Sequence, residues 1–204
     1  MTKEIDFYFD FISPYTYIAH KKIQKIQKIQ KIQKINKNNK IKFNYKPILL
    51  GGLHKLAGIT APAFNKFKMK NMHNDSVLIS KKNNFDFFWN NKFPINSLYI
   101  MRGYLFISEN EKKNYLDVFM DAYWKNNLDL SDEKILIQLL TYCKIDSEKF
   151  FNGIKDQSIK DNLKKLTEEA FQKEVFGAPT FIANNKLFWG QDRFEYALEE
   201  LKIN

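Results

Sequence analysis

The first apolar segment of the chain runs from Ile5 to Phe11 and is short and rich in aromatic residues. A run of this kind is typical of a buried β-strand. Ser13 and Pro14 follow it. This pair favours a helix start, because serine is a preferred N-cap and proline suits the first helical position. We therefore expect a strand that leads directly into a long helix.

Within that helix the triplet Ile-Gln-Lys repeats from Ile23 to Ile35. An α-helix has 3.6 residues per turn, so a repeat of three falls behind the helix by about 60° at each step. The repeated isoleucines therefore cannot share one buried stripe, and some of them must face solvent or a partner. A coiled-coil seam needs a period of 3.5 residues, which this repeat does not have.

The middle of the chain has a mainly helical pattern. A polar turn is predicted at Asn36–Lys40 and a second strand at Ile41–Tyr45, with Gly51–Gly52 and Pro62 marking a loop. Residues 64–155 are then expected to be helical. The predicted helices are Ser97–Ile107, Glu111–Lys125, Ser131–Cys143 and Ser147–Ile154, with Ser131 and Ser147 as N-caps.

The last quarter returns to strands. A helix over about Ser158–Glu174 is expected to end at Gly177. A β-hairpin follows, in which Ala178–Ala183 and Lys186–Trp189 flank an Asn-Asn turn. Asp192, with Glu195 three residues later, resembles a capping box at the start of a last helix.

This order of elements predicts an α/β fold, in which a small mixed sheet carries a large all-helical insertion. We place the sheet-containing domain at residues 1–55 and 156–204 and the helical insertion at residues 56–155.

The composition argues against nucleic acid as a specific partner. The chain of 204 residues has a formal charge of +10, but of its 33 basic residues only Arg102 and Arg193 are arginine. Readers of bases and phosphates favour the arginine fork. The lysines are also spread along the whole chain and follow no recognisable reader motif, so we interpret them as a solvated surface.

Cys143 is the only cysteine, which excludes an internal disulfide and a dithiol redox motif. Its apolar, helical surroundings predict a buried structural thiol. No apolar run approaches the roughly 20 residues of a membrane helix. The N-terminal residues have no signal-peptide pattern. We therefore expect a cytoplasmic protein with no membrane partner.

Ser13 is the first candidate for chemistry. Where a strand ends and a helix begins, unpaired N–H groups and the helix dipole favour an anion, and a thiolate there has a lowered pKa. A serine hydroxyl can donate to such an anion. The alternative is a plain N-cap. His20, His54 and His73 fall in no recognised triad pattern, so Ser13 has no evident base and is poorly equipped as a nucleophile.

Two further motifs lie near the C-terminus. Pro179 immediately precedes a predicted strand, where a cis bond would turn the Ala178 backbone outward to pair with an extended peptide. An ordinary trans proline opening an edge strand is the alternative. Asp192 follows Trp189 and Gln191 at a helix start, where it caps the helix, accepts from a ligand ammonium, or does both.

In combination these motifs resemble the 2-hydroxychromene-2-carboxylate isomerases and the kappa-class glutathione transferases, over essentially the whole chain. The resemblance implies a thioredoxin-like, DsbA-like fold with a helical insertion. The matching stretches are Asp6–Tyr15, Pro47–Gly52 with Lys55 and Gly58, Phe93–Asn96, and Val175–Phe181 through Trp189–Arg193.

The resemblance also implies a glutathione site without a metal. Ser13 would hydrogen-bond the thiolate, the backbone of Ala178 before a cis Pro179 would pair with the cysteinyl unit, and Lys55 would lie near the glycyl carboxylate. The γ-glutamyl end would contact Gln191 and Asp192, with Asp192 facing its ammonium. Trp189 and Tyr15 would complete the site.

One departure from the family is Ile59, where an asparagine that contacts glutathione is common. Asn65 is a nearby amide that offers a substitute. The first helix is also about three triplets longer than the family needs.

The function implied by the resemblance is glutathione-dependent cis–trans isomerisation of 2-hydroxychromene-2-carboxylate or a related unsaturated aromatic acid in aromatic catabolism, by a homodimer. The bound thiolate would add reversibly to an activated double bond. The aromatic segment Phe85–Trp89 would either wall a substrate pocket or belong to the core. Two alternatives stay open. One is a kappa-type transferase or peroxidase, and the other is a non-enzymatic interaction module that uses the lysine-rich helix.

Overall fold

The computed structural model of the chain describes residues 3–34 and 40–202. The turn predicted at Asn36–Lys40 lies outside these residues except for Lys40, and so does Ile35. Within the described residues, no helix combines the length and the apolar character needed to cross a bilayer.

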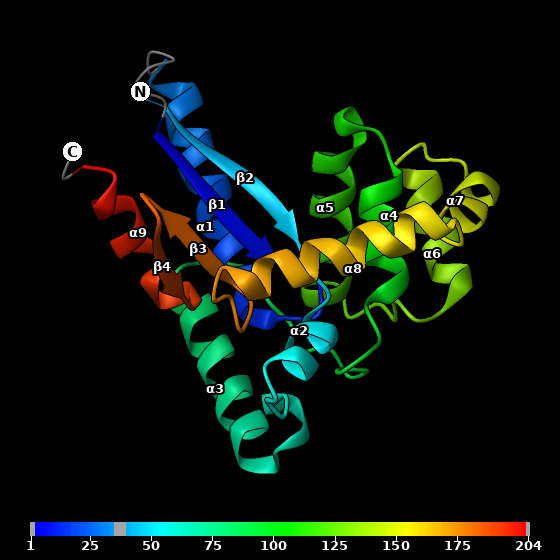
Figure 1. The fold of residues 1–204 in the computed structure, drawn as a ribbon, viewed down its shortest axis with the longest axis horizontal. Coiled ribbons are helices and arrows are strands. Elements are labelled where there is room, and N and C mark those ends of the chain that lie inside the picture. Colours follow the sequence, from blue (N-terminus) through cyan, green and yellow to red (C-terminus); the bar gives the residue numbers. More distant parts are fainter. Residues whose placement is uncertain (1–2, 35–39, 203–204) are drawn as a thin grey trace.

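Four strands form one mixed sheet in the order β2-β1-β3-β4 (Figure 1). They are β1 (Lys3–Phe9), β2 (Ile41–Pro47), β3 (Thr180–Ala183) and β4 (Lys186–Trp189). β1 runs parallel to β2 and antiparallel to β3, which forms a hairpin with β4. Asn184 and Asn185 have φ angles of 48° and 62°, and positive φ at both positions is typical of a tight hairpin turn. The predicted strands, hairpin and mixed sheet are confirmed.

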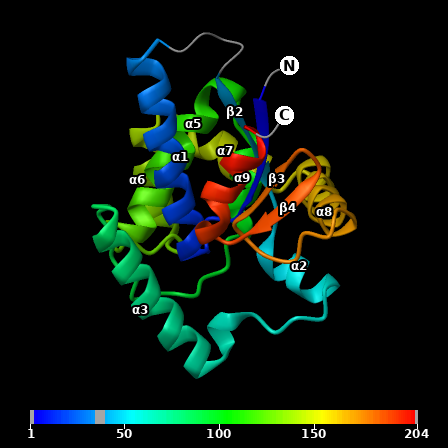
Figure 2. The ribbon, with the colours of Figure 1, turned by 90° about the vertical axis from the view of Figure 1, so that its left-hand side faces the viewer.

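Helices cover both faces of this sheet (Figure 2). α1 (Pro14–Ile32) and α9 (Phe194–Glu200) lie on one face, and α8 (Gln157–Gln172) lies on the other. Successive side chains of a strand point to opposite faces. Phe7 and Phe9 of β1 therefore join the cluster that contains Phe194, whereas Tyr8 joins the cluster that contains Ala170. The aromatic-rich first segment is thus buried on both sides.

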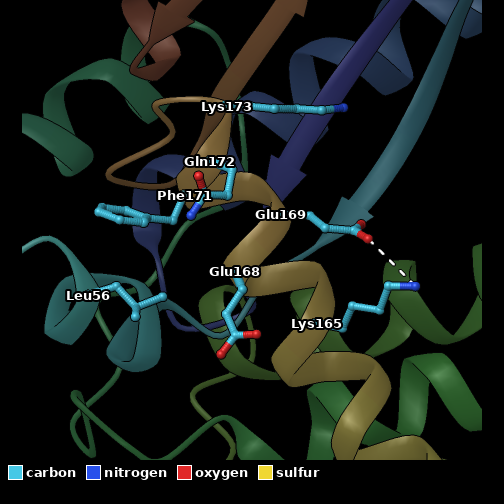
Figure 3. Close-up of a pocket in the computed structure, with 7 residues that line it drawn as sticks. All are labelled: Leu56, Lys165, Glu168, Glu169, Phe171, Gln172 and Lys173. Carbon is cyan, nitrogen blue, oxygen red and sulfur yellow. Dashed lines mark ion pairs between the residues drawn. The ribbon is translucent and has the colours of Figure 1, made fainter.

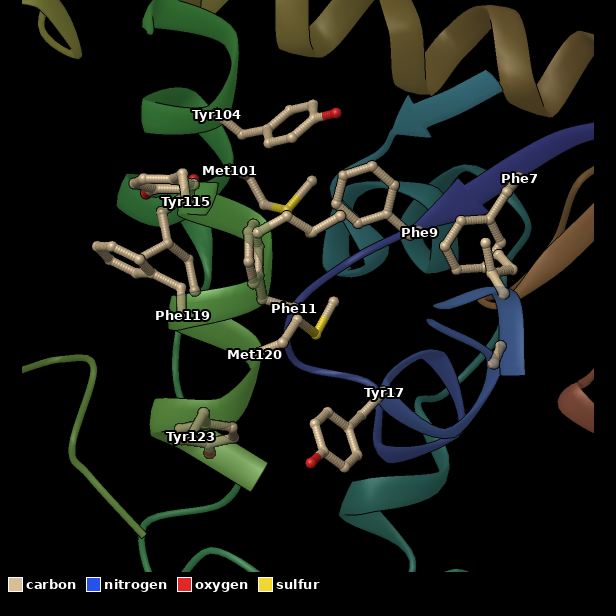
Figure 4. Close-up of a cluster of buried hydrophobic side chains, with 14 of the residues drawn as sticks. Phe7, Phe9, Phe11, Tyr17, Met101, Tyr104, Tyr115, Phe119, Met120 and Tyr123 are labelled. Carbon is tan, nitrogen blue, oxygen red and sulfur yellow. The ribbon is translucent and has the colours of Figure 1, made fainter. Parts of the chain in front are cut away.

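The other helices form the middle of the chain, and α4 to α7 gather beyond one end of the sheet (Figure 1). Phe9 packs edge-on against Tyr104 with 5.1 Å between ring centroids, and Phe11 against Tyr115 with 5.9 Å (Figure 4). One hydrophobic cluster therefore extends from the sheet into the helical segment. The domain boundaries given above stay a prediction. These helices are α2 (Leu50–Leu56), the 3₁₀ helix η2 (Pro62–Phe64), α3 (Lys66–Lys82), α4 (Leu98–Phe106), α5 (Glu109–Trp124), α6 (Glu133–Tyr142) and α7 (Ser147–Gly153).

The Ile-Gln-Lys repeat behaves as its period predicts. Ile23 is fully buried and Ile26 packs against the core, whereas Ile29 is 46% and Ile32 68% exposed. The helix ends at Ile32, one triplet before the repeat does. Cys143 is 7% exposed, and burial raises the pKa of its thiol to about 11, so the prediction of a buried structural thiol is also confirmed.

The predicted N-caps Ser131 and Ser147 are wrong. The cap of α6 is Asp132, whose carboxylate accepts from the Lys134 N–H. The cap of α7 is Asp146, which accepts from the Lys149 N–H. In both places an aspartate beside the serine takes the position, since a carboxylate also interacts favourably with the helix dipole.

Two further expectations about helix ends are corrected. α8 ends at Gln172, before Gly177, with Glu174 at a φ of 63° just beyond it. Asp192 does not cap the last helix, because α9 begins after Arg193 and has no side-chain cap.

The predicted loop at Gly51–Gly52 is in fact part of α2. Glycine disfavours a helix interior, so the local sequence argued against this helix. A distant residue supplies the missing stabilisation. The carboxylate of Asp10 accepts from the Leu50 N–H at 2.8 Å and caps α2 from outside its own sequence.

Candidate functional site

Ser13 lies at the start of α1 and joins two distant motifs. Its Oγ accepts from the Thr16 N–H at 3.2 Å, so it is the N-cap that the sequence predicts. The same hydroxyl donates to the carbonyl oxygen of Ala178 at 2.9 Å. This bond links residues 165 positions apart and fixes the cis-proline loop against the first turn of α1. Ser13 is therefore both a cap and part of a tertiary junction.

One backbone amide of the first turn remains free. Pro14 has no N–H, Thr16 donates to Ser13 Oγ, and Tyr17 donates to the Ser13 carbonyl. Among the described residues, the Tyr15 N–H has no acceptor. Together with the helix dipole, this amide gives the first turn of α1 the capacity to stabilise an anion beside the Ser13 hydroxyl.

The predicted cis bond is present between Ala178 and Pro179. The Pro179 carbonyl accepts from the Gly190 N–H at 2.9 Å, which ties this loop to the end of β4. Within residues 3–34 and 40–202 nothing accepts from the Ala178 N–H. An extended ligand therefore has a backbone donor available at this position.

Trp189 forms an exposed wall beside the loop. Its indole lies over Gly177, where an added Cβ would come within 2.6 Å of the Trp189 Nε1, so a larger residue there would displace the indole. The ring also contacts Phe176, at 5.0 Å between centroids. Because Trp189 is 52% exposed, it has apolar surface left to cover a ligand.

The short 3₁₀ helix η3 (Gln191–Arg193) carries the two polar residues predicted to bind the γ-glutamyl end. Gln191 is 6% exposed, and its Oε1 has no hydrogen-bond partner among the residues that the structure describes. The position of Asp192 depends on Gly190, whose φ is 102° and whose added Cβ would lie 2.5 Å from the Asp192 Oδ1. Lys22 of α1 donates to the Gln191 carbonyl at 3.0 Å and so anchors η3 to the helix that starts at Ser13.

Sequence reasoning missed Asp10, which is fully buried at the end of β1. Its carboxylate accepts from the N–H of Ile12 and of Leu50 and from the Ser97 hydroxyl, which lies at the start of α4. Burial raises the pKa of Asp10 to about 6, while these three hydrogen bonds oppose the shift. Asp10 thus holds three segments around the turn before Ser13. The sequence feature that could have pointed to Asp10 is an acidic residue directly after an apolar strand.

A second missed acid is Asp75 of α3. The Tyr15 hydroxyl donates to its Oδ2 at 2.9 Å, which connects α3 to the first turn of α1. Burial, this hydrogen bond and the negative charges of Asp75 and Asp192 all raise the pKa of Tyr15. Nothing in the sequence pattern pairs residues 15 and 75.

Lys55 does not contact the other predicted site residues. It is exposed in the last turn of α2, and the described residues include no hydrogen bond or ion pair to it. Gly58, with a φ of 64°, ends that helix. Ile59 is 41% exposed. The Asn65 Oδ1 caps α3 by accepting from two backbone amides, so this oxygen is already committed.

Two hollows of the surface lie away from these residues. One of about 820 Å³ lies between α2 and α8, where Leu56 and Phe171 extend toward each other (Figure 3). None of the predicted site residues lines it. A second of about 630 Å³ is lined by Phe85, Phe87 and Phe88, among others. Of that aromatic segment, Phe87 and Trp89 pack against the core, whereas Phe88 is 46% exposed.

The chain is similar to proteins named 2-hydroxychromene-2-carboxylate isomerase, both in sequence and in structure. A 2-hydroxychromene-2-carboxylate isomerase of Sphingobium xenophagum is 24% identical over 198 residues, covering 96% of both chains. One of Pseudomonas putida is 21% identical, covering 93% of this chain and 89% of the relative. A solved 2-hydroxychromene-2-carboxylate isomerase structure superposes with a TM-score of 0.85 at 20% identity, covering 98% of this chain and 95% of the other.

The DSBA-like thioredoxin domain model matches residues 4–202. Those residues include the strand that leads into the Ser13 helix, the helical segment and the hairpin that follows the cis proline. With this match and the geometry of its sheet, the chain belongs to the DsbA-like thioredoxin family.

Proposed function

We propose that the chain is a glutathione-dependent cis–trans isomerase that acts on 2-hydroxychromene-2-carboxylate or a related unsaturated aromatic acid. The observation that carries the proposal is the junction of Ser13 with Ala178 at the start of α1. At this junction the Ser13 hydroxyl and the Tyr15 N–H lie beside the Ala178 N–H, and neither of these two amides has an acceptor among the described residues. Two relatives named for this isomerase activity support the reaction class.

The residues present fit glutathione as a ligand. The Ala178 N–H is available to its backbone, and the Tyr15 N–H and Ser13 hydroxyl to its sulfur. Among the described residues the buried Oε1 of Gln191 lacks a donor, and an unpaired buried acceptor is costly. An ammonium group is such a donor. Lys55 is exposed and forms no ion pair with the described residues, so its ammonium is proposed to face the glycyl carboxylate.

When bound, glutathione supplies the nucleophilic sulfur for reversible addition to an activated double bond, which the chain lacks because position 13 is serine. Ser13 is not activated as a nucleophile, since no histidine or carboxylate of the described residues contacts its hydroxyl. Its role is to donate a hydrogen bond to the sulfur anion. The hydroxyl hydrogen now directed at the Ala178 carbonyl would turn to that anion, while Oγ continues to cap Thr16.

The test is a calorimetric titration with glutathione of the wild type, Ser13→Ala and Ser13→Thr. We expect saturable binding by the wild type. We expect a bound thiol pKa that is about one to two units higher in Ser13→Ala, which loses one charge-assisted hydrogen bond. Ser13→Thr keeps both the hydroxyl and the cap, and is expected to behave like the wild type. The thiol pKa is followed by thiolate absorbance.

Absence of wild-type binding at millimolar glutathione would remove the proposal. If the wild type binds glutathione, product analysis identifies the reaction. 2-Hydroxychromene-2-carboxylate, a chlorinated aromatic acceptor and a peroxide are offered separately. Turnover of the acceptor or the peroxide alone would assign the kappa-type activity in place of isomerisation.

A further inference from the structure

We propose that Asp10 is a positioning residue for the Ser13 site, and that only its ionised carboxylate holds the starts of α2 and α4 firmly against the turn that carries Ser13. Protonation of Asp10 therefore weakens binding at this site, so that ligand affinity depends on pH. The inference rests on the proposed function, because glutathione is the ligand whose binding changes. Four observations carry it.

The first observation is that three helix starts meet at one carboxylate. Asp10 accepts at 3.1 Å from the N–H of Ile12, which directly precedes the Ser13 cap of α1. It accepts at 2.8 Å from the N–H of Leu50, the first residue of α2. It also accepts at 3.0 Å from the hydroxyl of Ser97, the N-cap of α4, which does not cap its own helix. Since a helix N-terminus favours negative charge, this arrangement suits an anion.

The second observation connects Asp10 to the proposed site. The Ser13 N–H donates to the Asp10 backbone carbonyl at 3.3 Å, and the Ile12 N–H donates to the Asp10 side chain. Asp10 thus fixes two successive amides of the turn. The Ser13 hydroxyl at the end of this turn bonds to Ala178, so a looser turn also loosens the attachment of the cis-proline loop.

The third observation is that all three partners of the carboxylate are donors. A backbone N–H cannot accept, so the proton of the neutral acid has only the Ser97 hydroxyl as an acceptor among these partners. The bond to Ser97 then reverses its direction. The two bonds to backbone N–H groups lose their charge assistance, which makes a hydrogen bond about twice as strong. The neutral acid therefore holds the turn and the two helices less firmly than the carboxylate does.

The fourth observation is that both forms of Asp10 are populated near neutral pH. Complete burial raises its pKa to about 6, and the three hydrogen bonds are the only influences that lower this pKa. No charged side chain of the described residues contributes to it. The ionisable side chains on the three helices, which leave the pKa of Asp10 unchanged, are the lysines, Tyr15, Tyr17 and His20 of α1, His54 and Lys55 of α2, and Tyr99, Arg102 and Tyr104 of α4.

The experiment measures ligand binding by calorimetry between pH 5 and pH 7.5. The probe is the glutathione analogue γ-glutamyl-2-aminobutyryl-glycine, in which a methyl group replaces the thiol. None of its groups titrates in this range, so a pH dependence of binding reports on the protein. The proteins are the wild type, Asp10→Asn, Ser97→Ala and His54→Gln. His54 is a titratable residue of α2 that takes no part in the hydrogen bonds of Asp10, so its substitution is the matched control.

We expect the wild type to bind the analogue about fivefold more weakly at pH 5 than at pH 7.5, which corresponds to the loss of one ordinary hydrogen bond. The midpoint should lie near pH 6. Asp10→Asn should bind weakly at every pH, because its amide directs a donor at one of the N–H groups. Ser97→Ala removes a hydrogen bond that lowers the pKa of Asp10, so its midpoint should move to higher pH. His54→Gln should follow the wild type. By linkage, binding near pH 6 should release protons in the wild type but not in Asp10→Asn, detected as a heat that varies with the buffer.

Other outcomes separate the inference from the proposed function. Wild-type affinity for the analogue that is the same at pH 5 and pH 7.5 would overturn the inference and leave the proposed function standing. A pH dependence that persists in Asp10→Asn, or that disappears in His54→Gln, would belong to another group and overturn it as well. If Asp10→Asn does not fold, Ser97→Ala decides, because an unchanged midpoint in that variant contradicts the role of Asp10. Absence of glutathione binding by the wild type at every pH would remove the proposed function, and this inference with it.

Discussion

The two ends of α1 are held by different kinds of interaction. At the N-terminal end, Ser13 bonds to Ala178, Tyr15 bonds to Asp75, and Ile23 two turns further on is fully buried. At the C-terminal end, the isoleucines of the later repeat units, Ile29 and Ile32, are exposed. The first end is fixed by contacts with distant segments, whereas the second depends on local helix propensity and repetition.

This difference shows where change in the chain is tolerated. Repeat units that expose isoleucine and lysine leave the core unaffected, so the helix can lengthen at one end. At the other end a single side chain touches residues more than 50 positions away, and a substitution there alters several segments at once.

The largest expected effect compares two isoleucines of the same repeat. Ile23→Ala removes a fully buried side chain and should lower the free energy of unfolding by about 2–5 kcal/mol, since it leaves a cavity. Ile32→Ala changes an exposed residue and should stay within about 0.5 kcal/mol of the wild type. Urea unfolding measures both. Similar losses in the two variants would contradict the asymmetry of the helix.

The next effect concerns Asp10, the buried acid beside the N-terminal end. Its pKa is raised from 3.8 to about 6 by burial, so the folded state binds a proton more tightly than the unfolded state. The stabilisation from this proton is complete below about pH 3.8 and is lost as pH rises through 6. It amounts to roughly 2–3 kcal/mol. Asp10→Asn removes the titration.

The measurement is the free energy of unfolding of both proteins between pH 4 and 7. The free energy of unfolding of the wild type should fall relative to that of Asp10→Asn as pH rises, because only the wild type gains a buried charge. A difference that stays constant across this range would show that Asp10 titrates normally.

The smallest effect compares two glycines. Gly190→Ala forces a φ of 102° on a residue with a Cβ, which would meet the Asp192 carboxylate, and should cost about 1–3 kcal/mol. Gly51→Ala lies in α2 with no atom within 4 Å of the added Cβ, and should stabilise by about 0.5–1 kcal/mol. Thermal unfolding of the two variants should shift in opposite directions, and shifts of the same sign would refute this assignment.

Local features of the sequence were sufficient for much of the fold. The aromatic run of β1, the Ser-Pro helix start, the Asn-Asn hairpin turn and the exposure of the later isoleucines follow from periodicity and conformational preference within a few residues. The errors have two origins, one local and one tertiary. Asp132 and Asp146 outcompeted neighbouring serines as caps, and Gly51–Gly52 joined a helix because Asp10 caps it from 40 residues away.

The candidate site shows the same division. The resemblance named Ser13, Ala178, Gln191 and Asp192 separately, but the bond between Ser13 and Ala178, the orphaned Gln191 oxygen and the link from Tyr15 to Asp75 exist only in the folded chain. Each depends on which surfaces pack together and exclude water. A window of sequence carries conformational preference, but burial and long-range hydrogen bonds are set by the whole molecule, and these decide which side chains meet.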